Sequence, residues 1–420
     1  MAFLNKKSTF IIFACLFGFI SCNSSDAKKI ENQVIIKDSI PEQIQNKKII
    51  VGAQRTHIYF PILKNKNVAV VANQTSMIEN CHLVDSLFAL EMKIKKIFCP
   101  EHGFRGNADA GEVINNTMDT KTGLPIVSLY GNNKKPSNDE LKNIEIIIFD
   151  LQDVGARFYT YISTMHYIME ACAENNVKLI ILDRPNPNGY YVDGPVLEPA
   201  LKSFIGMHPV PVVHGMTVGE YAQMINGEKW LKNELLCDLQ VITCENYTHK
   251  FNYSLPVKPS PNLPNDRSVE LYPSICFFEG TNLSVGRGTN MQFQVVGHPL
   301  LKKVEGINFS FIPKPNEGAK NPLLNGEECF GFDFRIKEEQ FDSLPKLNLN
   351  YFIYAYSIFP DKSKFFLKNN MFDLLAGNKS LKKQIIEGKN YEEIRKSWQP
   401  DLEKFKQIRK KYLLYEDFEP

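Results

Sequence analysis

The chain has 420 residues, of which 43% are hydrophobic and 23% charged, a composition typical of a globular protein. A chain of this length exceeds what one hydrophobic core usually supports, so we expect two domains. The formal net charge is +2, and Lys and Arg are scattered among Asp and Glu, which argues against a nucleic-acid partner. The nine cysteines form no CxxC pair, which argues against a zinc site. Most lie in apolar runs, so we expect them to be small core side chains.

The first 22 residues have the pattern of a signal peptide. Two lysines precede an apolar run from Phe10 to Ile20, and the run ends in Ser21-Cys22. The run is too short to cross a bilayer as a stable helix. A small residue directly before a cysteine resembles a bacterial lipoprotein signal, so we expect a lipidated Cys22 as the mature N-terminus. The alternative is a secreted protein in which this cysteine has no such role.

Residues 23–45 are rich in polar side chains and are predicted to form a flexible tether. From residue 46 onward, short apolar segments alternate with helical patterns, which indicates a parallel sheet covered by helices and hence the α/β class. The expected strands are 48–52, 67–72, 94–99, 124–129, 145–149 and 177–182, and the expected helices lie at 81–92, from 137 and at 161–175.

Polar side chains follow four of these strands. The clusters are Asn73–Ser76, Glu101-His102, Asp150–Asp153 and Asp183–Asn186, and the third contains Gln152. Helix caps or turns would explain any one of them. Parallel strands end at the same edge of a sheet, where open α/β folds bind ligands. Four clusters together therefore predict a functional site at that edge.

Several kinds of site lack their sequence pattern. No GxGxxG turn follows the first strand, so a dinucleotide site is not supported. No HxxxH or HExxH segment supports a metal site, and no GxSxG elbow supports a serine nucleophile. The remaining chemistry is that of carboxylates, as in glycoside hydrolysis, where two carboxyl groups act as acid and as base or nucleophile.

Charged and aromatic residues suited to that chemistry lie near the strand ends. Arginines match a carboxylate by a two-point contact, which suits an anionic substrate, and tyrosines offer flat surfaces for sugar rings. The alternative for residues 150–157 is a helix start with an internal Asp-Arg pair. The candidates are Glu101, Glu112, Asp150, Asp153, Arg105, Arg157, Arg184, Tyr159 and Tyr161.

Longer motifs resemble a known family. The segments FCPEHGFRG at 98–106, FDLQDVGARFYTY at 149–161 and DRPNP at 183–187 are similar to those of the exo-acting β-N-acetylmuramidases of the NamZ type, formerly a domain of unknown function. Further matching segments follow in order at 209–220, 259–264 and 272–289. The resemblance implies a Rossmann-like domain with the site in a cleft against a second domain, and no cofactor.

The resemblance also implies the substrate, which is N-acetylmuramic acid at the non-reducing end of peptidoglycan-derived disaccharides and glycan fragments. Its lactyl carboxylate gives a nearby arginine a role. Within the matching motifs we expect Glu101 to be the general acid, with His102 orienting it or contacting the sugar. Asp153, Asp150 and Glu112, in that order, are candidates for the second carboxylate. Alternatively the acetamide of the substrate attacks, and retention or inversion stays open.

The rest of the chain is expected to complete the cleft. Its aromatic run at 351–356 is predicted to form a strand, and Trp398 is predicted to be a packing residue. Thr217 and Glu220 have the spacing of a capping box at the start of a helix. The resemblance implies that Glu279 and Arg287 reach over the cleft and bind substrate. The predicted organisation is a lipoprotein signal at 1–22, a tether at 23–45, a Rossmann-like catalytic domain at 46–255 and a smaller α+β domain at 256–420.

Two hypotheses for function follow. The first is a hydrolase in the periplasm or at the cell surface, bound to the membrane only through its lipid anchor. The second is a lipoprotein without catalytic activity that captures muramyl sugars of the cell wall. They differ in whether product appears on long incubation.

Overall fold

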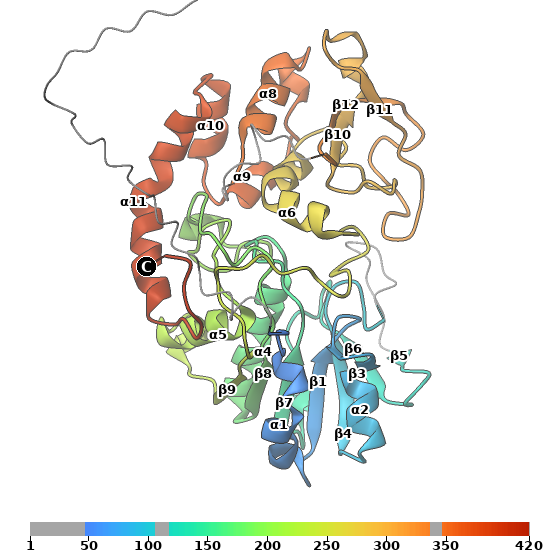
Figure 1. The fold of residues 1–420 in the computed structure, drawn as a ribbon, viewed down its shortest axis with the longest axis vertical. Helices are drawn as coiled ribbons and strands as arrows, with labels where there is room; N and C mark the ends of the chain where they lie inside the picture. The colour runs from blue at the N-terminus through green and yellow to red at the C-terminus, as the bar shows by residue number, and fades with distance from the viewer. Residues whose placement is uncertain (1–46, 106–116, 337–346, 420) are drawn as a thin grey trace, which may run out of the picture. The chain divides into compact units, whose positions relative to one another are not determined.

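A seven-stranded sheet organises the first half of the protein (Figure 1). The computed structural model describes residues 47–105, 117–336 and 347–419. The strands of this sheet are β1 (Val68–Ala72), β4 (Ile94–Cys99), β5 (Thr117–Met118), β6 (Pro125–Ser128), β7 (Ile146–Asp150), β8 (Lys178–Leu182) and β9 (Leu239–Ile242). Their order is β5-β6-β4-β1-β7-β8-β9, and all neighbours are parallel except β5 with β6. The parallel strands thus follow the Rossmann-like order 3-2-1-4-5-6.

Helices cover both faces of the sheet because alternate strand residues point to opposite sides. In β1, Val68, Val70 and Ala72 belong to one core cluster, while Ala69 and Val71 belong to the other. The first cluster includes side chains of α1 (Thr56–Leu63) and α2 (Leu83–Ala89). The second includes side chains of α3 (Asn138–Leu141), α4 (Tyr161–Asn175) and α5 (Val218–Gly227). The strands therefore read as continuous apolar runs.

Most elements expected from the sequence are confirmed, and α5 has the predicted capping box of Thr217 and Glu220. The strand predicted at 48–52 is wrong, because only Ile50 forms an isolated bridge, with Glu245, and the chain then turns into the short 3-10 helix η1 (Gly52–Gln54). At this turn the Gly52 amide donates to the carbonyl of Asp183 at 2.8 Å, which holds the chain at the end of β8. Helix α1 and strand β9 were not predicted.

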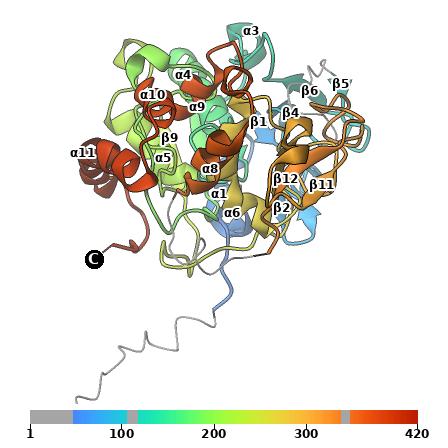
Figure 2. The same cartoon turned by 90° about the horizontal axis from the view of Figure 1, so that it is seen from above.

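The C-terminal part contains a small antiparallel sheet and several helices. The sheet has the order β10-β12-β11, with β10 (Val295–His298), β11 (Phe309–Phe311) and β12 (Cys329–Asp333). In the first half of the chain, β2 (Met77–Ile78) and β3 (Cys81–His82) form a separate two-stranded sheet. The helices are α6 (Asp266–Ile275), η4 (Cys276–Gly280), α8 (Asn350–Ile358), α9 (Met371–Ala376), α10 (Ser380–Ile386) and α11 (Tyr391–Lys410). Figure 2 shows β11 and β12 on one side of α6, and α10 and α11 on the other.

The strand predicted at 351–356 is wrong, because this segment lies in helix α8. Its aromatic residues favour a strand by type, but the buried positions are Phe352 and Ala355, three residues apart, while Tyr354 is half-exposed. That spacing is helical. Tertiary packing therefore overrides the local preference for a strand.

The first half and the C-terminal part share one hydrophobic cluster, in which Ile147 of β7 and Phe277 of η4 both take part. Trp398 of α11 is buried, as predicted for a packing residue, and its indole nitrogen donates to Asp193 at 3.0 Å. Residues 47–420 form one compact unit. The predicted domain boundary at residues 255/256 stays a prediction.

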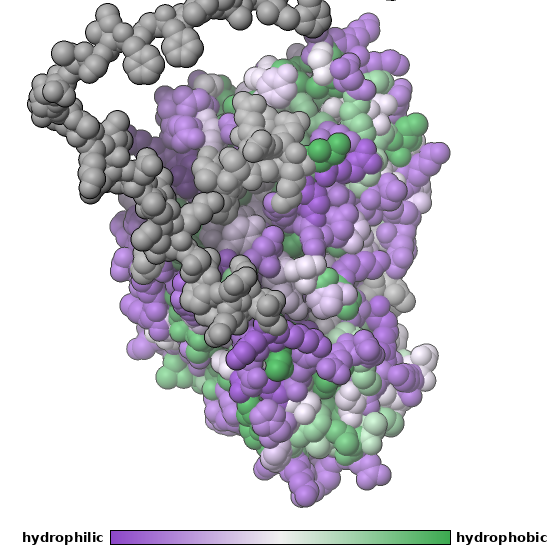
Figure 3. Space-filling view, in the orientation of Figure 1, coloured by the Kyte–Doolittle hydropathy of each residue, from purple (hydrophilic) through white to green (hydrophobic). Residues whose placement is uncertain are grey.

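The surface carries few large apolar side chains. The face seen in Figure 3 is mainly hydrophilic, with hydrophobic residues scattered over it. In the part of the chain that the structure describes, no helix has both the length and the apolar character that a membrane span needs. All described cysteines except Cys81 are buried, as expected for small core side chains.

Candidate active site

The four strands that deliver polar clusters lie next to one another in the sheet, in the order β4-β1-β7-β8. Their registers bring the ends together, since Val71 pairs with Phe98, Ala72 with Asp150 and Phe149 with Ile181. The convergence predicted from the sequence is confirmed. The ends of β4, β1, β7 and β8 therefore lie along one edge of the sheet.

A pocket of about 150 Å³ lies where this edge meets the C-terminal part. Glu101 and His102, which follow β4, form one side together with Tyr130, which follows β6. The C-terminal part contributes a charged pair, Glu279 and Arg287. Carboxylates and a guanidinium from distant parts of the chain therefore line one cavity.

Glu101 is held by two hydroxyl groups. The Thr160 hydroxyl donates to Oε2 of Glu101 at 3.0 Å, and the Tyr130 hydroxyl also donates to this carboxylate. Burial and the negative charge of Glu101 raise the pKa of Tyr130 to about 12. Thr160 is the N-cap of α4 but its side chain does not cap the helix, so its hydroxyl is available to Glu101. The positive end of the α4 dipole favours a carboxylate here.

His102 is buried and has a backbone φ of 71°. A non-glycine residue at positive φ is strained, and such strain is found at functional sites where the surrounding fold imposes it. Here the next residue, Gly103, also has positive φ and its amide donates to Pro100 at 3.1 Å. This turn presents Glu101 and His102 together to the pocket.

Glu279 and Arg287 form an ion pair of 2.7 Å between Oε1 and Nε. The Arg287 guanidinium also lies over the ring of Phe293, 5.0 Å from its centroid. Despite desolvation, the charge of Glu279 raises the pKa of Arg287 above its ordinary value. Nη1 of Arg287 is buried and finds no hydrogen-bond partner in the described part of the chain. The pair therefore fixes a guanidinium that still has a donor for an anion.

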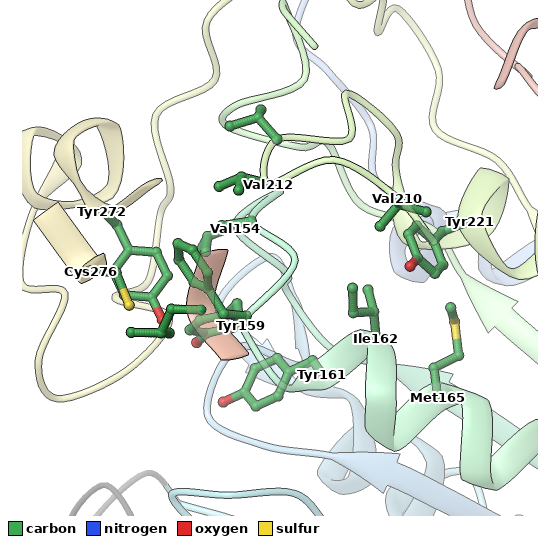
Figure 4. Packing of buried hydrophobic residues seen from close by; sticks show 14 of the residues in the cluster. Val154, Tyr159, Tyr161, Ile162, Met165, Val210, Val212, Tyr221, Tyr272 and Cys276 are labelled. Atoms are coloured by element: carbon green, nitrogen blue, oxygen red, sulfur yellow. The ribbon is translucent and has the colours of Figure 1, made fainter. Parts of the chain in front are cut away.

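Aromatic side chains form much of the remaining wall. The Tyr159 ring lies edge-on to Tyr161 at 4.7 Å and to Tyr272 of α6 at 5.9 Å between centroids. Figure 4 shows these three tyrosines grouped at the end of α4 that faces α6. Tyr159 donates to the carbonyl of Pro259 at 2.9 Å, so its ring is fixed. Such rings offer rigid apolar surface to a sugar.

Asp153 does not line the pocket. It is buried, its Oδ1 accepts from the amide of Gly155 at 2.7 Å, and its Oδ2 has no partner among the described residues. Burial raises the pKa of its carboxyl from 3.8 to about 7, so burial favours the protonated form of this group. Nε2 of His214 lies 3.9 Å from Oδ1, and burial lowers the pKa of His214 to about 3, so this imidazole is neutral.

Asp150 and Arg184 form a buried two-point ion pair, with 2.6 Å between Nε and Oδ1 and 2.9 Å between Nη2 and Oδ2. This differs from the alternative in which Asp150 pairs with an arginine of its own segment. Gln152 donates to the carbonyls of Asp153 and Pro185. None of these side chains lines the pocket; they connect the strand ends beneath it.

Asn73 is also buried, and its amide donates to the hydroxyl of Tyr161 at 2.8 Å. It therefore positions a residue of the pocket wall without lining the pocket itself. Arg157 is fully buried and donates to the carbonyls of Pro195, Val210 and Leu375, each at 2.8 Å. These bonds join the segment between β7 and α4 to two loops and to α9.

Arg105 pairs with Asp119 at 3.0 Å and with Asp85 at 3.4 Å, and its side chain keeps 35% of its surface exposed. It does not line the pocket. Glu112 lies outside the described residues. Of the predicted site residues, the structure thus brings together Glu101, His102, Tyr159, Tyr161, Glu279 and Arg287.

Several residues that line the pocket were not predicted from the sequence. Tyr130 directly follows the end of the predicted strand 124–129, so the strand-end rule that found Glu101 would have found it. Thr160 and Asn262 lie in motifs that were recognised, but no local pattern indicates their side-chain directions. Phe204 has no sequence signal, because a turn brings it to the pocket.

Models of the exo-beta-N-acetylmuramidase NamZ match most of this chain, the N-terminal one over residues 68–267 and the C-terminal one over residues 270–415. A protein of Bacillus subtilis (strain 168), named peptidoglycan beta-N-acetylmuramidase NamZ, is 38% identical over 370 residues, covering 84% of this chain and 88% of that protein. The chain belongs to the NamZ family. The resemblance seen in its motifs is thereby confirmed.

Two crystal structures of DUF1343 family proteins from Bacteroides fragilis have a fold similar to that of this chain. The first has a TM-score of 0.81 and 48% identity, and covers 88% of this chain and 100% of that chain. The second has a TM-score of 0.74 and 28% identity, and covers 88% and 99%. The mostly parallel sheet with a smaller C-terminal part is therefore a shared architecture.

Proposed function

We propose that this protein is an exo-β-N-acetylmuramidase, a glycoside hydrolase that removes N-acetylmuramic acid from the non-reducing end of peptidoglycan fragments. The observation that carries the proposal is the pocket in which Glu101, held by two hydroxyl groups, shares one cavity with the paired Arg287. The name of the Bacillus subtilis relative supports it.

Glu101 is assigned the role of general acid. Glycoside hydrolysis needs a carboxyl group that gives a proton to the oxygen of the leaving sugar. Glu101 is the carboxyl group at the strand edge of this pocket, and the hydrogen bonds from Thr160 and Tyr130 fix its direction. A fixed acid reduces the rearrangement needed to reach the transition state.

Asp153 is the first candidate for the second catalytic carboxylate. Asp153 does not line the pocket, but it is near two tyrosines that do. Burial is the main reason that the pKa values of Tyr159 and Tyr161 are raised, and the charge of Asp153 adds to the effect. Asp153 can therefore act on the pocket through the electrostatics of its wall. Attack by the acetamide of the substrate would need no second carboxylate as nucleophile.

Arg287 supports a substrate that carries a negative charge. N-acetylmuramic acid differs from N-acetylglucosamine by a lactyl carboxylate, and a guanidinium binds a carboxylate strongly. The ion pair with Glu279 leaves Nη1 of Arg287 for this contact.

The test is incubation with a disaccharide of N-acetylmuramic acid linked to N-acetylglucosamine, followed by chromatography. We expect free N-acetylmuramic acid from the wild type, and at least a 1,000-fold slower release (order of magnitude) from Glu101→Gln, which keeps the shape but cannot give a proton. Glu305→Gln, at an exposed position, serves as the matched control. Binding without product would instead support the non-catalytic lipoprotein.

We also propose that the protein is exported and anchored through a lipid on Cys22, at the periplasmic face or the cell surface. The support is the charged start, short apolar run and small residue before the cysteine. Labelling with a radioactive fatty acid should be lost in Cys22→Ala, and an unlabelled wild type would overturn the anchor.

A further inference from the structure

A segment of the pocket wall, residues 259–262, carries a buried amide whose oxygen has no partner among the described residues. Asn262 lines the pocket and is only 1% exposed. Its Nδ2 donates to the carbonyl of Gly318 at 2.7 Å, which fixes the orientation of the amide. Its Oδ1 is buried and finds no donor in the described part of the chain. A buried acceptor without a donor is costly, so a ligand that supplies an N–H or O–H gains affinity.

The surrounding structure holds Asn262 in place. Gly318 has a φ of +89°, and a Cβ on it would meet the ring of Pro261 at 2.5 Å. Glycine therefore allows the loop to approach the segment closely. Pro259 at the start of the segment accepts from Gln74 and Tyr159, each at 2.9 Å. The unpartnered oxygen is therefore a feature of a well-anchored segment.

Asn262 lines the same pocket as Glu101 and Arg287, and hydrogen bonds link its segment to the structure around both of these charged residues. On one side its segment contacts Tyr159, the neighbour of the Thr160 that holds Glu101. On the other side the loop of Gly318 binds the chain next to Arg287, because the Lys314 amide donates to Gly288 at 2.8 Å and Asn316 donates to Thr289 at 2.9 Å.

The sugar of the proposed function has three substituents in sequence that could meet these three residues. The bond to be cleaved is at C1, next to Glu101, and the lactyl group is on C3, where it would meet Arg287. The substituent between them is the acetamido group on C2. Among the substituents at C1, C2 and C3, its N–H is the hydrogen-bond donor.

We propose that Oδ1 of Asn262 accepts the acetamido N–H of the bound sugar, so that this residue selects 2-acetamido sugars. The inference rests on the proposed function, since that function defines the sugar. It adds a specificity-determining residue on a loop outside the strand edge. The hydrogen bond would also fix the plane of the acetamide beside Glu101.

The test compares two ligands of nearly equal shape by calorimetry, N-acetylmuramic acid and its analogue with a 2-O-acetyl group in place of the acetamide. The wild type should bind the acetamido sugar about 10- to 100-fold more tightly, because the ester has no N–H. Asn262→Ala should lose most of this ratio. Asn282→Ala, which removes a similar amide bond to the carbonyl of Lys364 at 2.8 Å, should keep it.

Equal binding of the two sugars by the wild type would overturn the proposal, as would an equal loss for both sugars in Asn262→Ala. The wild-type comparison still decides the matter if that variant does not fold. The 4-deoxy and 6-deoxy sugars complete the test. If Asn262→Ala weakens the binding of every sugar except one of these two, Oδ1 contacts the 4- or the 6-hydroxyl instead. Binding needs no turnover, so a protein that discriminates between the ligands but cleaves no disaccharide would refute only the proposed function.

Discussion

The hydroxyl of Thr160 donates a hydrogen bond of 3.0 Å to Oε2 of Glu101, and the two residues are 59 positions apart in the chain. The fold joins them because β4 ends where α4 begins. A threonine at the start of a helix usually accepts a bond from the helix backbone. Here it instead positions a carboxyl group in the pocket.

Replacing Thr160 by Val removes this hydrogen bond while keeping the branched shape. We expect kcat on the muramyl disaccharide to fall about 10-fold, since one hydrogen bond to a charged group contributes about 1.5 kcal/mol. KM should change little. Thr160→Ser keeps the hydroxyl and should retain most of the activity, and a Ser variant as slow as the Val variant would contradict the positioning role.

Arg287→Lys keeps the positive charge but loses the planar guanidinium. We expect KM for the muramyl disaccharide to rise about 10-fold or more, because a lysine cannot make the two-point contact with a carboxylate. Glu279→Gln should give a smaller rise, since it loosens the 2.7 Å pair that orients Arg287.

The control for both variants is a substrate whose lactyl group is an uncharged amide. Each variant should lose little on this substrate relative to the wild type. An equal loss on both substrates would mean that the pair supports the fold of the pocket and does not bind the carboxylate.

Asp153→Asn should change how stability depends on pH. Burial raises the pKa of this carboxyl from 3.8 to about 7. Between these values the folded protein binds more protons than the unfolded chain, so this group lowers the free energy of unfolding as the pH rises. The loss is complete above pH 7 and amounts to about 4 kcal/mol at most.

The Asn variant cannot lose a proton, so its melting temperature relative to the wild type should rise from pH 4 to pH 8. A difference that does not depend on pH would contradict the raised pKa. Measuring kcat on the same samples separates the effect on stability from an effect on catalysis. If Asp153 has only a structural role, the Asn variant keeps its activity.

Arg157→Met removes the donors from the carbonyls of Pro195, Val210 and Leu375. Unpaired buried carbonyls are costly, so we expect a loss of about 3 kcal/mol or more in the free energy of unfolding. Since Arg157 does not line the pocket, KM of the folded variant should stay near the wild-type value. Arg105→Ala, at a partly exposed ion pair, should cost about 1 kcal/mol or less.

Much of the sheet was predictable because its strands are buried on both faces and read as apolar runs such as Val68–Ala72. The polar residues after these strands predicted the site, and Glu101 and His102 indeed line a pocket. The prediction of a strand at 351–356 is wrong because aromatic residues favour strands by type. The buried positions of this segment in α8 depend on neighbours that are remote in sequence.

The α/β class, the edge of the sheet that borders the pocket and the family of the chain can all be read from the amino-acid sequence. The choice of charged residues that share the pocket depends on tertiary packing. Asp150, Arg157 and Arg184 resemble Glu101 and Arg287 in residue type and in their place near strand ends or motifs, yet they are buried in ion pairs or on backbone carbonyls. The physical reason is that side-chain direction and burial arise from packing between distant segments, which local residue order does not encode.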